Sequence, residues 1–432
     1  MSAVSTTSTV GAFTREAFEQ SLARCSHLPA WWLDRKRAAY ERFASLPMPK
    51  RTDEGWRFSN FSALTLDGFE PAAGDPRPVT RAKAFAAASL SFLNNAASGR
   101  DGTVPAGIIF DTLQNALLKH GDLVKAHLLT EPSKLGSGKF AALHEAFLED
   151  GAFVYAPKGT ELALPLAVYH LADGQNTAVF PHTLVVAEEN TKLTVTDFYG
   201  SVDPQAGHQL AIGGNDLYAG HGAQLSYIAL QDWSRDALSF QFNATVVKRD
   251  AKVLSLNLHA GAKQARHESF SQLQAPGAHS EMLALTVAQG AQEFDQRTLQ
   301  IHQAPNTSSN LLYKNALLDT AKTIFSGLIV VDPDAQQTDA YQSNRNLMLS
   351  DEAEAHSLPG LEIQANDVRC THGATSARID REQEFYLEAR GIKPAQAQEL
   401  LVFGFFEEVL SKVENETLHD SLSEIIRQKF KH

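Results

Sequence analysis

The stretch Val253-Leu254-Ser255-Leu256-Asn257-Leu258 alternates apolar with small polar side chains from Leu254 onward, which is the period-two pattern of a β-strand. It belongs to a series of short strand-like segments that begins after Gly151, with no helical pattern between them. The other segments are 183–186, 193–198, 225–230, 245–247, 282–287 and 324–331. Turn-forming or small residues precede several of them, at Asn190, Gly222, Ala251 and Gly277. The implied repeat of about 26–32 residues suits the coils of a β-solenoid better than propeller blades of about 40–45 residues, although a β-sandwich explains the pattern equally well.

Helical patterns flank this region on both sides. Apolar residues recur at three-to-four spacing between 14 and 43 and again between 113 and 148, with an extended linker rich in Pro, Gly and Asp at 47–81. After residue 376, helices are expected at 382–389, from Pro394 onward, and at 417–430. We therefore expect an α+β chain with a helical N-terminal domain and linker (1–150), a strand-rich core (151–375) and a C-terminal helical domain (376–432).

The composition limits the kinds of partner. The 432 residues carry 38 Lys and Arg against 50 Asp and Glu, a net charge of −12. This balance argues against nucleic acid and against an anionic membrane surface. The chain contains no run of about 18 apolar residues, and residues 1–10 have neither the basic start nor the apolar core of a signal peptide. With only two cysteines, we expect a cytoplasmic protein.

Motifs for common enzyme chemistries are missing. Gly136-Ser137-Gly138-Lys139 lacks the spacing of a phosphate-binding loop, and neither a nucleophile elbow nor His-Glu-x-x-His occurs. The carboxylates Glu281, Glu293 and Asp295 are expected to be solvated strand residues, and the histidines of the strand region to be surface or structural residues. A secreted carbohydrate-active β-helix enzyme would need clustered carboxylates, which are not visible. We therefore expect no catalytic site.

One short motif can bind a metal. Cys370 and His372 are separated by one residue in an extended segment, so both side chains point to the same face. Thiolate and imidazole bind iron and zinc, but two protein ligands do not complete a tetrahedral site. Further ligands would have to come from elsewhere in the chain or from a partner. A buried structural thiol with a hydrogen-bonded histidine explains the pair as well.

A longer set of motifs surrounds this pair. It comprises His302-Gln-Ala-Pro-Asn-Thr-Ser-Ser-Asn-Leu-Leu-Tyr-Lys-Asn315, Phe325-Ser-Gly327, Ala335-Gln-Gln-Thr-Asp-Ala-Tyr-Gln-Ser-Asn-Arg-Asn-Leu347, Leu361-Glu-Ile363, Cys370-Thr-His-Gly-Ala-Thr375, Phe385-Tyr-Leu387 and Arg390-Gly-Ile392. These motifs resemble the SufB/SufD family, the scaffold subunits of the SUF iron–sulfur cluster assembly machinery. The Cys-x-His-Gly-Ala-Thr wording, and the absence of cysteine between 26 and 369, are more similar to SufD than to SufB.

The resemblance implies a fold and a set of partners. The expected fold is a right-handed parallel β-helix between two helical domains. A SufD-like chain would pair with a SufB-like subunit through the β-helix ends, and both would bind the ABC-type ATPase SufC. The expected SufC-binding surface is on the C-terminal helices, with Gly391, Leu400, Phe405 and Val409.

The resemblance also implies a role for the Cys-x-His motif. His372 would be a ligand of iron or of a nascent cluster held transiently near the interface with SufB, and Cys370 is a second candidate. No permanently bound cofactor and no catalytic activity are expected, and the isolated chain could form a homodimer. The alternative within the family is a SufB-like scaffold that acts as a homodimer.

Overall fold

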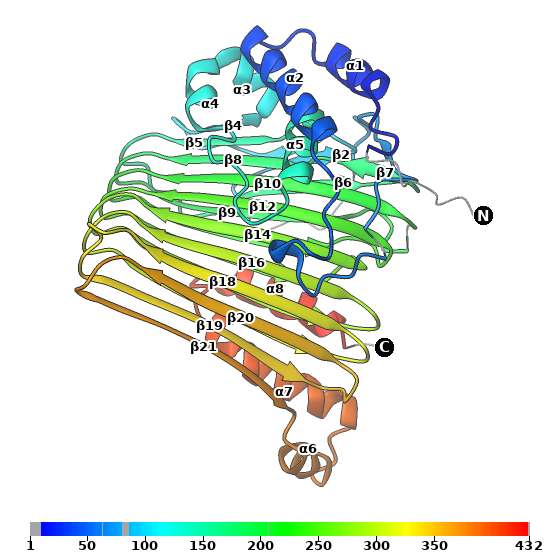
Figure 1. Ribbon diagram of the computed structural model, residues 1–432, viewed down its shortest axis with the longest axis vertical. Helices are drawn as coiled ribbons and strands as arrows, with labels where there is room; N and C mark the ends of the chain where they lie inside the picture. Colours follow the sequence, from blue (N-terminus) through cyan, green and yellow to red (C-terminus); the bar gives the residue numbers. More distant parts are fainter. Residues whose placement is uncertain (1–9, 63, 80–85, 206, 431–432) are drawn as a thin grey trace.

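The computed structural model describes residues 10–62, 64–79, 86–205 and 207–430. Its strands form two facing sheets, and the chain alternates between them as it advances along the long axis of the molecule (Figure 1). Sheet A contains β4 (Ile109–Thr112), β5 (Ala152–Ala156), β8 (His182–Ala187), β10 (Gln209–Ala219), β12 (Ala237–Val247), β14 (Gln264–Leu273), β16 (Glu293–His302), β18 (Lys322–Val331) and β20 (Glu354–Ile363), with β7 (Thr177–Val179) and β1 (Glu70–Pro71) joined at its side. Sheet B contains β3 (Ala96–Gly102), β2 (Ala88–Leu93), β6 (Leu166–Ala172), β9 (Lys192–Ser201), β11 (Gln224–Asp232), β13 (Lys252–His259), β15 (His279–Ala288), β17 (Ser308–Leu317), β19 (Thr338–Met348) and β21 (Val368–Arg378).

The strand pairing establishes a β-solenoid of about eight turns. Neighbouring strands from β5 and β6 onward run parallel, which a β-sandwich built from hairpins does not allow. The repeat ranges from 26 residues, where Leu238 pairs with Gln264, to 32 residues, where Lys192 pairs with Gln224. The predicted repeat is therefore confirmed, and the sandwich alternative is wrong.

A column of tight turns explains where each repeat bends. Asn190, Gly222 and Gly277 have positive φ angles of 56°, 66° and 77°, in the left-handed region that Asn and Gly tolerate. Between them, Asp250 takes this conformation and not its neighbour Ala251, which was expected at the turn. The turns are joined by backbone hydrogen bonds, such as that from Asn190 to the carbonyl of His221. Successive turns of the solenoid therefore bend at equivalent positions, one above the other.

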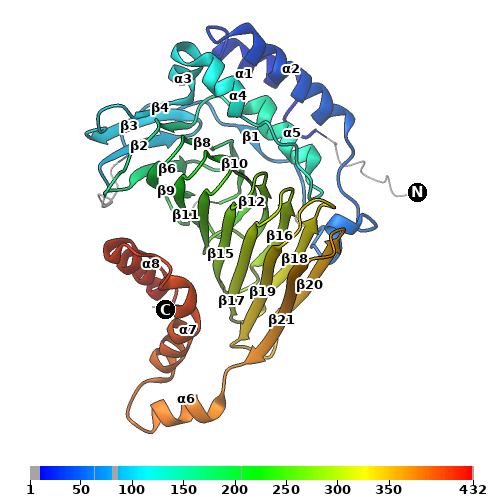
Figure 2. The same cartoon turned by 90° about the vertical axis from the view of Figure 1, so that its left-hand side faces the viewer.

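Helices cover the outer faces of both sheets, as Figure 2 shows. On sheet A lie α1 (Arg15–Arg24), α2 (Ala30–Ser45) and α5 (Gly138–Phe147), with α3 (Leu113–Lys119) and α4 (Gly121–His127) nearer the first turns. Phe140 of α5 stacks on Phe240 of β12 with ring centroids 3.9 Å apart, inside an apolar cluster that also includes residues of α1 and α2. On sheet B, α7 (Pro394–Leu410) and α8 (Glu416–Gln428) bury their apolar sides against β13, β15 and β17, while α6 (Arg381–Glu388) buries none of its side chains. The helical flanks predicted from the sequence are present at both ends of the chain.

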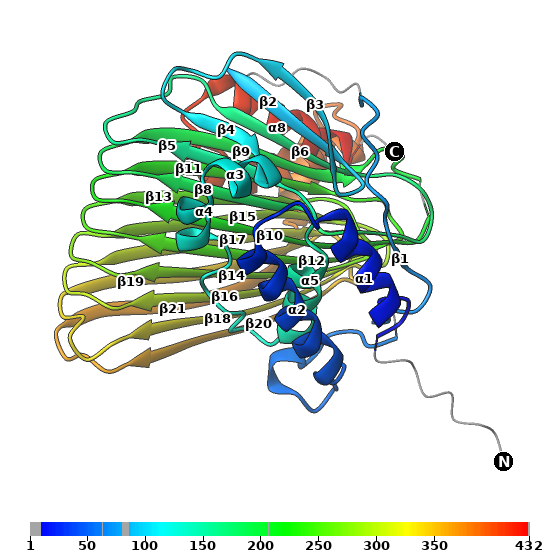
Figure 3. The ribbon, with the colours of Figure 1, turned by 90° about the horizontal axis from the view of Figure 1, so that it is seen from above.

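The two ends of the solenoid differ. Before residue 151 the chain contains β2, β3 and β4, where the sequence pattern indicated only helix and linker; β3 and β4 pair antiparallel with their neighbours and finish the first turns. At the other end, β20 pairs with β18 and β21 with β19, and within the described residues no further strand follows either of them. The view along the long axis shows the first turns lying in front, beneath α3 and α4 (Figure 3).

Among the helices in the described ranges, none combines the length and the apolar character that crossing a bilayer requires.

Candidate functional site at the open end of the solenoid

The Cys-x-His motif lies on β21, the last strand of sheet B. Cys370 pairs with Ala340 of β19, and His372 pairs with Gln342. Ala340 and Gln342 are 1% and 0% exposed and face the interior of the solenoid. Since in-register residues of parallel strands point to the same side, Cys370 and His372 occupy the inward face of the last turn. They therefore lie together, as the one-residue spacing predicts.

Exposure changes abruptly at this strand. Leu311, Gln342 and His372 are in register on three successive strands and form one inward row. Leu311 and Gln342 are fully buried, whereas His372 is exposed. Every position of β21 is exposed or half-buried. An inward-facing imidazole is accessible only because no further turn stacks on it.

The side chain of His372 has no polar partner in the described structure. Within the described part of the chain its side chain makes no hydrogen bond or ion pair, and no group of three or more His, Cys, Asp or Glu side chains is arranged to hold a metal. A neutral imidazole is a good ligand for iron. By themselves, Cys370 and His372 would supply one or two ligands of a metal site, and the remaining ligands would have to come from a second surface.

Cys370 is less available than His372. Its thiol is half-buried beside an apolar cluster that includes Ile329 and Ala340. Burial raises the pKa of the Cys370 thiol, against a smaller opposite effect of a hydrogen bond from the backbone N–H of Ala340. Because the thiolate is the form that binds metals, Cys370 would need a metal or a base to remove its proton.

Two asparagines of the quoted 335–347 motif hold the last turn in place. The Asn346 amide donates to the Thr375 carbonyl at 3.3 Å and to the Ser376 hydroxyl at 3.2 Å on β21. Ser357 of β20 donates to Asn344 at 2.6 Å. These contacts attach both terminal strands from inside the solenoid. The sequence alone does not predict that these asparagines attach the terminal strands, because neither belongs to a recognisable chemical motif.

The C-terminal helices present a separate apolar surface. Phe385, Tyr386 and Leu400 are 70%, 56% and 52% exposed, and Gly391 is exposed beside them. Val409 is fully buried against sheet B.

Phe405 also packs within this chain. It belongs to the same apolar cluster as Val409, and the Lys314 ammonium lies 5.0 Å from its ring centroid. Of the four residues expected to bind SufC, Gly391 and Leu400 are therefore accessible, whereas Val409 attaches α7 to the solenoid.

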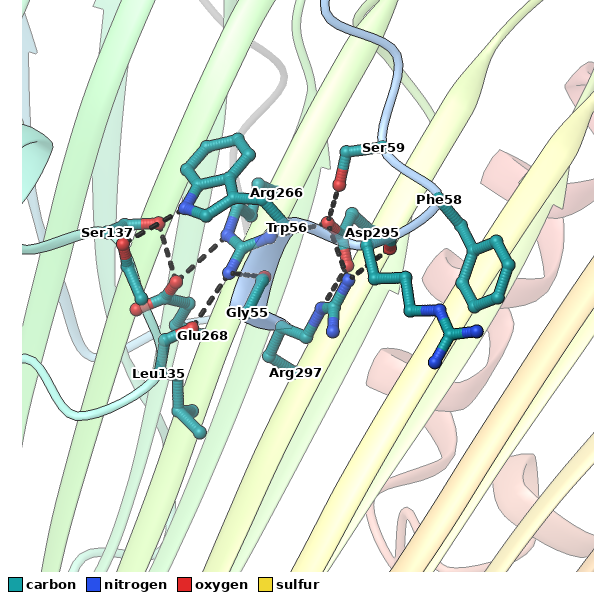
Figure 4. A network of polar contacts seen from close by, with 12 residues as sticks. Gly55, Trp56, Phe58, Ser59, Leu135, Ser137, Arg266, Glu268, Asp295 and Arg297 are labelled. Carbon is teal, nitrogen blue, oxygen red and sulfur yellow. Dashed lines mark hydrogen bonds and ion pairs between the residues drawn. The ribbon is translucent and has the colours of Figure 1, made fainter. Parts of the chain in front are cut away.

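A buried charge cluster on sheet A ties the N-terminal segment to the solenoid (Figure 4). Arg266 of β14 bonds Glu268 at 2.9 Å and Asp295 of β16 at 2.5 Å, and it donates to the carbonyl of Gly55 at 2.7 Å. The Ser59 hydroxyl donates to Asp295 at 2.6 Å. Burial would raise the pKa of Asp295, but the guanidiniums of Arg266 and Arg297 outweigh it and lower that pKa.

This cluster corrects one expectation from the sequence. Asp295 and Glu293 are only 1% and 6% exposed, so both are buried under the segment 54–60 and are not solvated strand residues. Glu281 is half-buried and forms an ion pair with Lys412 at 2.9 Å.

Family models and known relatives both match this chain. A family model described as "SUF system FeS cluster assembly, SufBD core domain" matches residues 170–405, and one for the "SufBD protein N-terminal region" matches residues 17–168. The chain is 28% identical to the iron–sulfur cluster assembly protein SufD of Bacillus subtilis (strain 168) over 93% of its own length and 95% of that protein. It is 28% identical to SufD of Escherichia coli (strain K12), over 88% and 89% of the two chains, and 24% identical to SufB of Bacillus subtilis (strain 168), over 91% and 88%.

The fold thus defines a parallel β-solenoid whose last strand carries the exposed imidazole of His372. The chain belongs to the SufBD family of iron–sulfur cluster assembly proteins, and within it the chain is SufD-like. The family and fold class predicted from the motifs are confirmed.

Proposed function

We propose that this chain is a non-catalytic scaffold subunit that pairs with a SufB-like subunit and a SufC-like ATPase. Iron or a nascent cluster, the cargo of the complex, is held transiently between this chain and the SufB-like subunit. The observation that carries the proposal is the exposed, unpartnered His372 on the inward face of the last strand.

The uncovered last turn supports pairing at this end. Strands β20 and β21 are 10 and 11 residues long, and each has a neighbour on one side only within the described chain. Unpaired backbone groups on long edge strands favour association with another β-surface. A subunit that covers this end would also exclude water from His372, which strengthens any metal–ligand interaction there.

A division of roles follows for the two motif side chains. The imidazole of His372 is exposed and has no partner in the described structure, so a ring nitrogen is accessible to a metal. Cys370 has a thiol pKa raised by burial, so it joins only when a metal displaces its proton. We therefore assign His372 as the principal ligand and Cys370 as a secondary one.

The ATPase would dock on the exposed apolar surface of the C-terminal helices. Phe385 and Tyr386 of α6, with Leu400 of α7, form this surface, and Gly391 lies at the turn between the helices. Because α7 packs against sheet B through Val409, movement of the docked ATPase would be transmitted to the solenoid. We place this function in the cytoplasm, in keeping with two cysteines that are both free thiols.

The test is co-purification of the tagged chain with its SufB-like and SufC-like counterparts, followed by size, iron and sulfide analysis. The His372→Ala variant is compared with His356→Ala, which removes a histidine of the same last turn from the outer face, where it stacks on Phe58 with centroids 4.8 Å apart. We expect both variants to assemble and only His372→Ala to lose iron and sulfide. Unchanged iron and sulfide in that variant, or a chain that does not assemble, would contradict the proposal.

A further inference from the structure

Gln342 is a buried polar residue directly behind the candidate ligand. It lies on the inward face of β19, is 0% exposed, and is the register partner of His372. Its side-chain amide donates to the carbonyl of Gly327 at 3.3 Å across the interior. Its Oε1 atom is buried and has no hydrogen-bond partner within the described structure.

Gly327 of β18, in the opposite sheet, lies close to this amide. A Cβ atom built on Gly327 would lie 2.2 Å from Oε1 of Gln342 and 2.7 Å from its Cδ. The same Cβ would lie 2.7 Å from Cζ of Phe325. A glycine at position 327 therefore leaves room for both the glutamine side chain and the phenylalanine ring.

An unsatisfied buried acceptor is unfavourable, by about 1–3 kcal/mol, unless it serves a purpose. The next inward position in the row after Gln342 is His372, whose imidazole carries an N–H donor in its neutral form. Cys370 precedes His372 by two residues and Ala374 follows by two, so His372 is the only residue in register with Gln342 on β21.

We propose that Gln342 is the positioning residue of His372: its Oε1 accepts the N–H of one ring nitrogen and directs the other ring nitrogen toward the open end. Metal-ligating histidines are commonly oriented in this way by a carbonyl or carboxylate acceptor, which fixes both the tautomer and the ring direction. This hydrogen bond is not among those of the described structure; it forms when the two side chains turn toward each other, and it needs no partner subunit. Its consequence for iron rests on the proposed function.

The experiment measures the ring tautomer of His372 in the isolated full-length chain by ¹⁵N NMR with labelled histidine. Spectra are taken at about pH 8, where an imidazole of ordinary pKa is neutral. His372→Ala identifies the resonance. We expect one predominant tautomer in the unaltered chain, a mixture close to that of free imidazole in Gln342→Leu, and a predominant tautomer again in Gln342→Glu, which keeps an acceptor oxygen in place.

Gln300→Leu is the matched control. Gln300 is also 0% exposed, donates once, to Ser309 at 2.7 Å, and has an unpartnered Oε1, but its row leads through Ile329 to β20 and not to β21. This variant should leave the tautomer of His372 unchanged. If Gln342→Leu does not fold, Gln342→Met replaces it, because a thioether is only a weak acceptor.

A His372 tautomer that is the same in the unaltered chain and in Gln342→Leu would overturn the proposal, and so would an equal shift in the Gln300 control. In the assembled complex, Gln342→Leu is expected to bind iron roughly 10- to 100-fold more weakly. A tautomer shift without any loss of iron in either His372→Ala or Gln342→Leu would uphold the contact and reject the proposed function. The two conclusions therefore fail separately.

Discussion

The solenoid begins and ends in different ways. At its first turns, β3 and β4 are short strands of seven and four residues that pair antiparallel with β2 and β5, and Arg100 and Asp111 form an ion pair at 2.9 Å between them. At its last turn, β20 and β21 are long, parallel and followed by no capping strand in the described chain. Short edge strands discourage association, whereas long edge strands with a row of unpaired backbone groups favour it.

We expect the closed body of the solenoid to determine stability and the open end to determine function. Inward positions in the middle of the solenoid are sealed by the turns on both sides, and their polar groups serve packing. The same inward row becomes accessible at β21, where the imidazole of His372 is exposed to solvent. Changes in the closed body should therefore alter folding, and changes at the open end should alter assembly or cargo.

The largest effect is expected from Arg266→Met in the closed body. This substitution leaves the carboxylates of Glu268 and Asp295 buried without their shared cation, which typically lowers the free energy of unfolding by about 3–5 kcal/mol. Arg369→Met at the open end is the control, because Arg369 has an 82% exposed side chain and one ion pair at 3.7 Å. Chemical denaturation should show a change within about 0.5 kcal/mol for the control. Equal losses in the two variants would refute the distinction between body and end.

Buried histidines make the closed body sensitive to acid. Burial lowers the pKa of His144 and His267 to about 3 and that of His170 and His302 to about 4, from 6.5. Between about pH 6.5 and pH 4 the unfolded chain binds these four protons and the folded chain does not, so stability falls as the pH falls. Burial raises the pKa of Asp150 from 3.8 to about 7, which opposes the effect by one proton.

The unfolded chain binds up to four more protons on these histidines than the folded chain, and one fewer on Asp150. Because the unfolded histidines are only partly charged at pH 6, the net excess there is about two protons, and it approaches three at lower pH. We expect the free energy of unfolding to decrease by roughly 3 kcal/mol per pH unit below pH 6. Urea unfolding at pH 7, 6 and 5 measures this slope. Stability that is flat or rises across this range would show that these side chains are not buried in their neutral form.

Asn346→Ala should loosen the open end alone. The substitution removes the donor to Thr375 and Ser376, which fixes β21 to β19 from inside, at an expected loss of about 1–3 kcal/mol in local stability. Amide hydrogen exchange should become faster at 368–378 and stay unchanged in β10 and β12. Asn310→Ala, on the outer face of β17, is the comparison variant. Faster exchange throughout the chain would mean that the last turn is not an independent unit.

The smallest effect on stability is expected from His372→Ala. An exposed residue whose only polar contact would be the one proposed with Gln342 contributes little, so the free energy of unfolding should change by no more than about 1 kcal/mol. His302→Ala should cost roughly 1–3 kcal/mol, because its ring nitrogens contact Thr307 and Ser309 at 2.8 Å in the interior. Thermal unfolding compares the two variants. A large loss in His372→Ala would indicate a structural histidine.

The solenoid could be predicted because its strands repeat one local pattern. Alternating segments such as Val253–Leu258 follow from one inward and one outward face, and residues that tolerate positive φ mark the bends. Strand β3, with the sequence Ala-Ala-Ser-Gly-Arg-Asp-Gly, shows no such alternation. It is a strand because β2 offers it an edge, which is a tertiary effect that a local pattern does not contain.

The candidate site was predictable only in part. The spacing of Cys370 and His372 places both on one face, but the exposure of His372 depends on where stacking stops. The burial of Asp295 depends on Ser59, which is 236 residues away in the sequence. Gln342 carries no signal of its own, because its unpaired oxygen is evident only once Gly327 and His372 are placed around it.

We propose that the open last turn is the surface through which this chain assembles. This proposal is tested by amide hydrogen exchange of the chain, alone and bound to its SufB-like partner. We expect amides of β20 and β21, at 354–363 and 368–378, to become strongly protected on binding, while β3 and β4 at the capped end do not change. Formation of the complex with exchange at 354–378 unaltered would contradict it.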